Sequence, residues 1–195
     1  LACQYVQVAT PNLHNHGAFQ GGQMRYQLIY KWLEKQGSLF VLDDYLEYEN
    51  YTLDFWTNVS LEDNWQDINV PAIHIGGWYD IFCQGTIDAF MGYQYQGGPD
   101  AAGKSKLIMG PWTHGGAKST NQGQLIYPEN CKDSFSNELF WDMVNQYTMN
   151  QPGEYDDWPS VYYYVMGDVD DSNAPGNEWK AAEIWPVPYS EVGWY

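Results

Sequence analysis

The stretch "VPAIHIGGWYD" (residues 70–80) is a short apolar run that begins at a proline and stops at two glycines. Runs of this kind are typical of buried parallel strands. The segment "CQGTIDAFMGYQYQ" (83–96) predicts a helix, and "KSKLIMG" (104–110) repeats the pattern of a buried strand. Strand, helix and strand in this order are the unit of an open α/β sheet with parallel strands.

Two polar residues follow these strands at matching places. Asp80 comes just after the first strand, and His114 lies in "GPWTHG" after the second. Reactive groups of open α/β sheets gather at the carboxyl ends of the strands, and acid followed by histidine is the second half of the Ser…Asp…His order of α/β-hydrolases. The alternatives are that Asp80 only caps the following helix and that His114 is a packed loop histidine.

Other segments outline the rest of the chain. Residues 20–36 carry apolar residues at four-residue spacing and predict an amphipathic helix that ends at Gly37, and residues 134–149 predict another. After residue 151, the short aromatic segments "SVYYYVMG", "EWKAAEIWPV" and "GWY" predict the first strands of a separate all-β module. The loop "DVDDSNAPGNE" (168–178) alternates acids but lacks the glycine and glutamate of a calcium loop, which favours a β-turn insertion.

Composition excludes some classes of function. The formal net charge of −17 repels phosphate backbones, so nucleic acid is not an expected partner. No apolar stretch is long enough to span a bilayer, and the first ten residues do not form a signal peptide. Such acidity favours a secreted or periplasmic protein, with the cytoplasm left open. The three cysteines match no zinc or redox spacing and allow at most one disulfide.

The histidines raise the question of a metal. "HNH" (His14 and His16) and His74 could be ligands, but the sequence shows no acid or cysteine beside them at ligand spacing. His74 also lies inside the predicted buried strand, where a core role is the simpler interpretation. We therefore expect no metal site and no cofactor.

Three segments together resemble a known family: the stretch from "YTLDFW" to "GGWYDIFCQGT" (51–86), then "KLIMGPWTHG" (106–115), then "YYYVMGDVDDSNAPGNEWKAAEIWP" (162–186). They resemble the cocaine-esterase, X-prolyl dipeptidyl aminopeptidase and α-amino-acid ester hydrolase group of α/β-hydrolases. The resemblance implies that Asp80 and His114 are the acid and base of a catalytic triad. It implies four parts: the end of an upstream region (1–16), a helical cap segment (17–69), the C-terminal part of the α/β-hydrolase domain (70–151) and the start of a β jelly roll (152–195).

The nucleophile of this group is missing from the sequence. No serine lies in a G-x-S-x-G or related strand-to-helix elbow. We therefore expect a fragment of a larger serine hydrolase whose nucleophile lies outside these residues, acting on a small ester, an α-amino acyl ester, an amide or an X-Pro peptide. Trp78, Tyr79 and Trp112 are candidate substrate contacts, and a homo-oligomer stays open. The alternative is a non-catalytic binding or structural protein that keeps the hydrolase scaffold.

Overall fold

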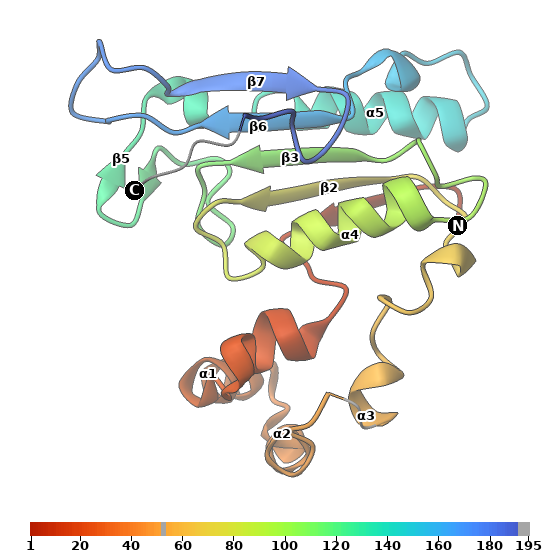
Figure 1. The fold of residues 1–195 in the computed structure, drawn as a ribbon, viewed down its shortest axis with the longest axis vertical. Coiled ribbons are helices and arrows are strands. Elements are labelled where there is room, and N and C mark those ends of the chain that lie inside the picture. Colours follow the sequence, from red (N-terminus) through yellow and green to blue (C-terminus); the bar gives the residue numbers. More distant parts are fainter. Residues whose placement is uncertain (52–53, 191–195) are drawn as a thin grey trace.

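The computed structural model describes residues 1–51 and 54–190. Its centre is a five-stranded sheet in the order β1-β2-β3-β6-β7 (Figure 1). The first four strands run parallel, and β7 pairs antiparallel with β6. The strands are β1 (Gln4–Gln7), β2 (Ala72–Gly77), β3 (Lys106–Gly110), β6 (Val161–Val165) and β7 (Glu178–Ala182), with a separate small pair β4 (Asn121–Gln122) and β5 (Leu125–Ile126).

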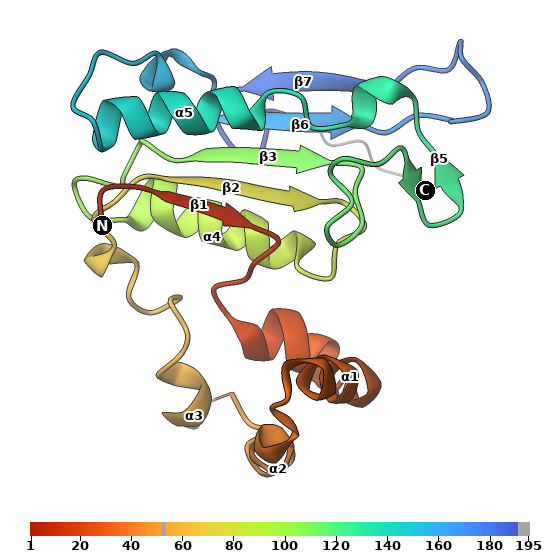
Figure 2. The same cartoon turned by 180° about the vertical axis from the view of Figure 1, so that it is seen from behind.

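Helices cover both faces of this sheet. α4 (Cys83–Gln96) lies on one face and α5 (Ser136–Tyr147) on the other (Figures 1 and 2). Side chains of neighbouring strand residues point to opposite faces, so Leu107 and Met109 pack with Phe90 of α4, while Ile108 packs with Leu139 of α5. Every residue of β2 and β3 is buried, which explains their continuous apolar sequences.

The predicted strand–helix–strand unit is confirmed at β2, α4 and β3, and α5 agrees with the helix predicted at 134–149. The helix predicted at 20–36 is shorter. α1 spans Tyr26–Gln36 and ends at Gly37, whose left-handed φ of 68° suits a helix C-terminus. Its first predicted turns are lost because Gly21 and Gly22 also have positive φ, which interrupts a continuous helix. β1 was not predicted.

A helical lobe (residues 13–51 and 54–57) stands apart from the sheet, on the lower side of Figure 1. It contains α1, α2 (Leu42–Glu47), α3 (Asp54–Thr57) and short helical turns such as His14–Ala18. The lobe has its own apolar cluster, centred on Ala18, Phe19, Ile29, Leu33, Tyr45 and Trp56. This cluster explains the aromatic composition of the segment.

The prediction that a separate β module begins near residue 152 is wrong for β6 and β7. β6 hydrogen bonds in parallel with β3, so both strands extend the central α/β sheet. The aromatic sequence of β6 is explained by burial of Tyr164 and Val161 within that sheet. The predicted insertion at 168–178 lies in the connection between β6 and β7, and its last residue is the first of β7. The expected strand "GWY" (193–195) lies outside the described residues.

The structure also bears on the predictions about membrane spans and disulfides. No helix among residues 1–51 and 54–190 is long and apolar enough to cross a membrane. The three cysteines, Cys3, Cys83 and Cys131, are all free thiols.

Candidate active site

The loops that follow β2 and β3 are joined by backbone hydrogen bonds. The N–H of Trp78 donates to the carbonyl of Gly110 at 2.9 Å, and the N–H of Tyr79 donates to the carbonyl of Trp112 at 3.0 Å. The approach is so close that a Cβ on Gly77 would lie 2.0 Å from the Trp112 oxygen. The second glycine of "HIGGWYD", which is the last residue of β2, is therefore needed for contact between the two loops.

Asp80 and His114 meet at the end of these loops. Asp80 Oδ1 lies 3.1 Å from His114 Nδ1. The Asp80 side chain is fully buried, while the His114 side chain is 52% exposed. A carboxylate at Nδ1 holds the proton there and leaves Nε2 as the basic nitrogen. Among the described residues, no hydrogen bond engages Nε2.

Asp80 also contacts the start of α4. Its Oδ1 accepts the N–H of Phe82 at 2.8 Å, one residue before the helix. This bond closes a turn before α4, whose N-cap residue is Phe82 and which has no side-chain cap hydrogen bond, so Asp80 is not the N-cap of the helix. The buried carboxylate benefits from the positive end of the α4 dipole. Its second oxygen, Oδ2, is buried without a hydrogen-bond partner among the described residues.

An apolar cavity of about 210 Å³ lies beside His114, between the helical lobe and the loop after β2. The lobe contributes Leu28, Ile29 and Trp32 of α1, together with Leu13 and Gly17, and the other side is formed by Ile81, Phe82 and His114. The ring of Phe82 meets the imidazole edge to face, at 5.8 Å between centroids. A ligand bound in this cavity would lie against His114.

The three candidate substrate contacts do not line this cavity. Trp112 is 2% exposed, and its indole N–H donates to the carbonyl of Cys131 at 2.8 Å, so its prediction as a substrate contact is wrong. Trp78 donates to the carbonyl of Tyr164 and stacks on Trp185. The Tyr79 hydroxyl lies 2.8 Å from that of Tyr127. Neither Trp78 nor Tyr79 lines the cavity beside His114, and their role stays a prediction.

Cys83 is the thiol nearest in sequence to Asp80. Burial and the negative charge of Asp80 both raise the pKa of this thiol. A raised pKa disfavours the thiolate, which is the nucleophilic form of cysteine. Cys83 is therefore a poor candidate for the nucleophile.

The three histidines considered as metal ligands lie in different surroundings in the structure. His74 is 1% exposed within β2, and burial lowers its pKa to about 3, so it is a core residue as expected. His14 stacks on Phe19 in the helical lobe. His16, however, lies with the carboxylates of Glu62 and Asp88. The premise that no acid supports these histidines is wrong for His16, because residues distant in sequence provide the acids.

Comparison with known proteins gives consistent results. A sequence model of the X-Pro dipeptidyl-peptidase (S15) family matches residues 33–116, a range that contains both Asp80 and His114. The chain is 24% identical over 138 residues to the cocaine esterase of Rhodococcus sp. (strain MB1 Bresler). The chain is similar to the X-Pro dipeptidyl-peptidase and cocaine-esterase group. The predicted resemblance is thereby confirmed.

Solved structures agree in fold. A CocE/NonD family hydrolase from Staphylococcus aureus superimposes over 98% of this chain with a TM-score of 0.67 and 16% identity. An aminopeptidase from a marine sediment archaeon, Thaumarchaeota archaeon, covers 82% of the chain with a TM-score of 0.57 and 20% identity. The chain spans 21% of the length of the cocaine esterase, 31% of the staphylococcal hydrolase and 24% of the archaeal aminopeptidase. The predicted α/β-hydrolase fold class is confirmed for the described sheet and helices.

Proposed function

We propose that this chain provides the acid and base of a serine hydrolase that cleaves esters or amides through an acyl-enzyme. The observation that carries the proposal is the 3.1 Å contact between buried Asp80 and the Nδ1 atom of exposed His114. The relatedness to hydrolases supports it. The nucleophilic serine is proposed to come from a part of the protein outside these 195 residues.

Each group has a defined role in the proposed reaction. His114 Nε2 takes the proton of the serine hydroxyl as the serine oxygen attacks the substrate carbonyl. The resulting imidazolium gives that proton to the leaving alcohol or amine. It then takes a proton from the water that hydrolyses the acyl-enzyme. Asp80 accepts the Nδ1–H throughout, orients the ring and stabilises the imidazolium.

The lining and volume of the cavity support a proposal for the class of substrate. Its lining from α1 and from Ile81 and Phe82 is apolar, and a volume of about 210 Å³ fits a small acyl or aryl group. We therefore propose small apolar esters or amides as substrates. The shape alone favours neither an amino acyl ester nor an X-Pro peptide.

A covalent probe tests this proposal on the full-length protein that contains the chain. A fluorophosphonate should label one serine, and His114→Ala should reduce both labelling and ester hydrolysis by roughly 10⁴-fold or more because the base is lost. Asp80→Asn should reduce them by roughly 10³–10⁴-fold because the imidazole is held in the wrong tautomer.

Asp100→Asn is the matched control, since Asp100 is an exposed carboxylate that pairs with Lys104 on the surface. It should label and hydrolyse like the wild type. Absence of labelling in a folded wild-type protein would instead favour a non-catalytic protein on a hydrolase scaffold. Full activity of the His114→Ala variant would exclude His114 as the base.

A further inference from the structure

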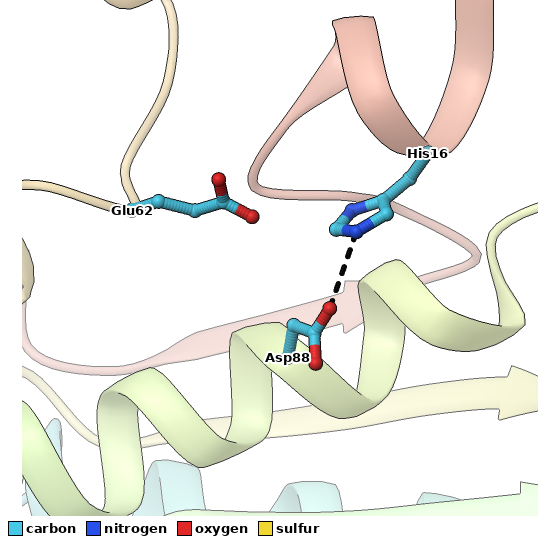
Figure 3. A group of neighbouring side chains, drawn as sticks. All are labelled: His16, Glu62 and Asp88. Atoms are coloured by element: carbon cyan, nitrogen blue, oxygen red, sulfur yellow. Dashed lines mark ion pairs between the residues drawn. The ribbon is translucent and has the colours of Figure 1, made fainter. Parts of the chain in front are cut away.

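A second cluster of polar side chains lies where the helical lobe meets α4. His16, Glu62 and Asp88 point toward one another from three separate segments (Figure 3). Their nearest nitrogen and oxygen atoms all lie within 4.8 Å of one another, and His16 Nε2 is 3.2 Å from Asp88 Oδ2. Within residues 1–51 and 54–190, this is the one group of three such side chains close enough to share a metal ion.

A hydrogen bond with the Thr10 hydroxyl orients the ring of His16. The Thr10 hydroxyl donates to the carbonyl of Asn12 and accepts the N–H of Asn12, both at 3.1 Å. Its oxygen lies 2.9 Å from His16 Nδ1. This contact occupies Nδ1 and leaves Nε2 as the ring nitrogen that faces the Asp88 carboxylate. Nε2 is therefore the nitrogen of His16 that is placed to bind a metal ion together with this carboxylate.

The two carboxylates are also held by outer partners. Asn12 Nδ2 donates to Glu62 Oε2 at 2.5 Å. Gln84 Nε2 donates to Asp88 Oδ1 at 2.8 Å, which leaves Oδ2 directed at His16. Hydrogen bonds from outer residues that orient each ligand are a common feature of metal sites. Here each of the three candidate ligands has one.

Charge favours a divalent ion at this place. Two carboxylates and a neutral imidazole have a formal charge of −2, and no lysine or arginine in the described part of the chain forms an ion pair with Glu62 or Asp88. One nitrogen and two oxygen donors are ligands that zinc accepts, and a water would complete a four-coordinate shell. Zinc–ligand bonds of about 2.0–2.1 Å separate tetrahedral ligands by about 3.3 Å, close to the 3.2 Å between His16 and Asp88.

We propose that His16, Glu62 and Asp88 form a zinc site that connects the helical lobe to the sheet domain. His16 lies in the turn His14–Ala18 of the lobe, Glu62 lies in the segment that returns to β2, and Asp88 lies on α4. A bound ion fixes all three segments to one point. Its role is to hold the lobe that forms one wall of the cavity beside His114.

The test is zinc titration by calorimetry on the full-length protein without a histidine tag. We expect one zinc ion per chain to bind to the wild type, and Asp88→Asn, Glu62→Gln and His16→Gln each to weaken that binding at least about tenfold. Thr10→Val, which removes only the outer partner of His16, should weaken it by about 10–100-fold. Asp100→Asn, an exposed ion-paired carboxylate elsewhere, should bind like the wild type.

Three outcomes overturn the proposal. Zinc binding that is absent from the wild type, or unchanged in Asp88→Asn, shows that His16 and Asp88 form only an ion pair. Calcium or magnesium binding as tight as that of zinc excludes a nitrogen-containing zinc site. Asp88 is partly exposed, so its variant is expected to fold, and the melting temperature without metal checks this.

Discussion

At the scale of single residues, the site depends on a close backbone contact that leaves no room for a side chain at Gly77. Asp80 is useful to His114 only because the loops after β2 and β3 touch, and they touch because Gly77 leaves room for the Trp112 carbonyl. The same carbonyl accepts the N–H of Tyr79, the residue before Asp80. The position of the acid relative to the base is thus set by a glycine and two backbone hydrogen bonds.

Gly77→Ala tests this dependence. The added methyl carbon would lie 2.0 Å from the Trp112 oxygen and 2.6 Å from its carbonyl carbon, so the loop that carries His114 must move. We expect the free energy of unfolding to fall by about 2–3 kcal/mol, although alanine is normally better than glycine in a strand. Urea denaturation measures the loss, and fluorophosphonate labelling should fall with it.

Gly153→Ala is the comparison, because the nearest atoms there lie 3.1 Å from the added carbon, so little needs to move. A Gly77→Ala protein as stable and as reactive as wild type would show that the two loops adjust freely. In that case the close contact does not position Asp80.

At the scale of elements, the sequence predicted those strands and helices that short local patterns determine. β2, β3 and α4 follow from apolar runs bounded by glycine and proline, and Asp80 and His114 follow from the rule that parallel strands end at one edge. β6 was recognised as a strand but assigned to the wrong module, because its sequence does not reveal that it pairs with β3. The cluster of His16, Glu62 and Asp88 could not be predicted, since only the tertiary fold brings its members together.

The contact between β2 and α4 contains a titratable group, His74. Both ring nitrogens are buried without hydrogen-bond partners among the described residues, and the ring packs against Tyr93 and Phe90 of α4. Burial lowers the pKa of His74 from 6.5 to about 3. Between these pH values the unfolded chain binds a proton that the folded chain does not. Its contribution therefore makes the protein less stable as the pH falls below 6.5.

His74→Leu should remove this part of the pH dependence. From pH 6.5 to pH 4.5, the wild type should lose roughly 2–3 kcal/mol through His74 alone, because each pH unit contributes at most about 1.4 kcal/mol. Urea denaturation of both proteins at pH 7.5 and 4.5 gives the difference in unfolding free energy, in which the many carboxylates cancel. If the wild type and His74→Leu differ in unfolding free energy by the same amount at both pH values, His74 is not neutral and buried.

At the scale of the whole molecule, the described residues divide into a sheet with its helices and a helical lobe with an apolar cluster of its own. The sheet is covered on both faces by α4 and α5, and every residue of β2 and β3 is buried (Figures 1 and 2). The helical lobe has a separate cluster built on one helix of three turns and on the short helices α2 and α3. Helices as short as these depend on tertiary packing, so the lobe is the less stable half.

Native-state hydrogen exchange should therefore separate the two halves. We expect amides of β2 and β3 to exchange only through global unfolding, and amides of α1 and α2 to exchange at least roughly 100-fold faster through opening of the lobe alone. Because the lobe forms one wall of the cavity beside His114, this opening would also admit substrate and release product. Mass spectrometry of peptides from 26–47 and 72–110 measures both rates. Equal protection in the two regions would mean that lobe and sheet unfold as one unit, so that access to His114 requires a different motion.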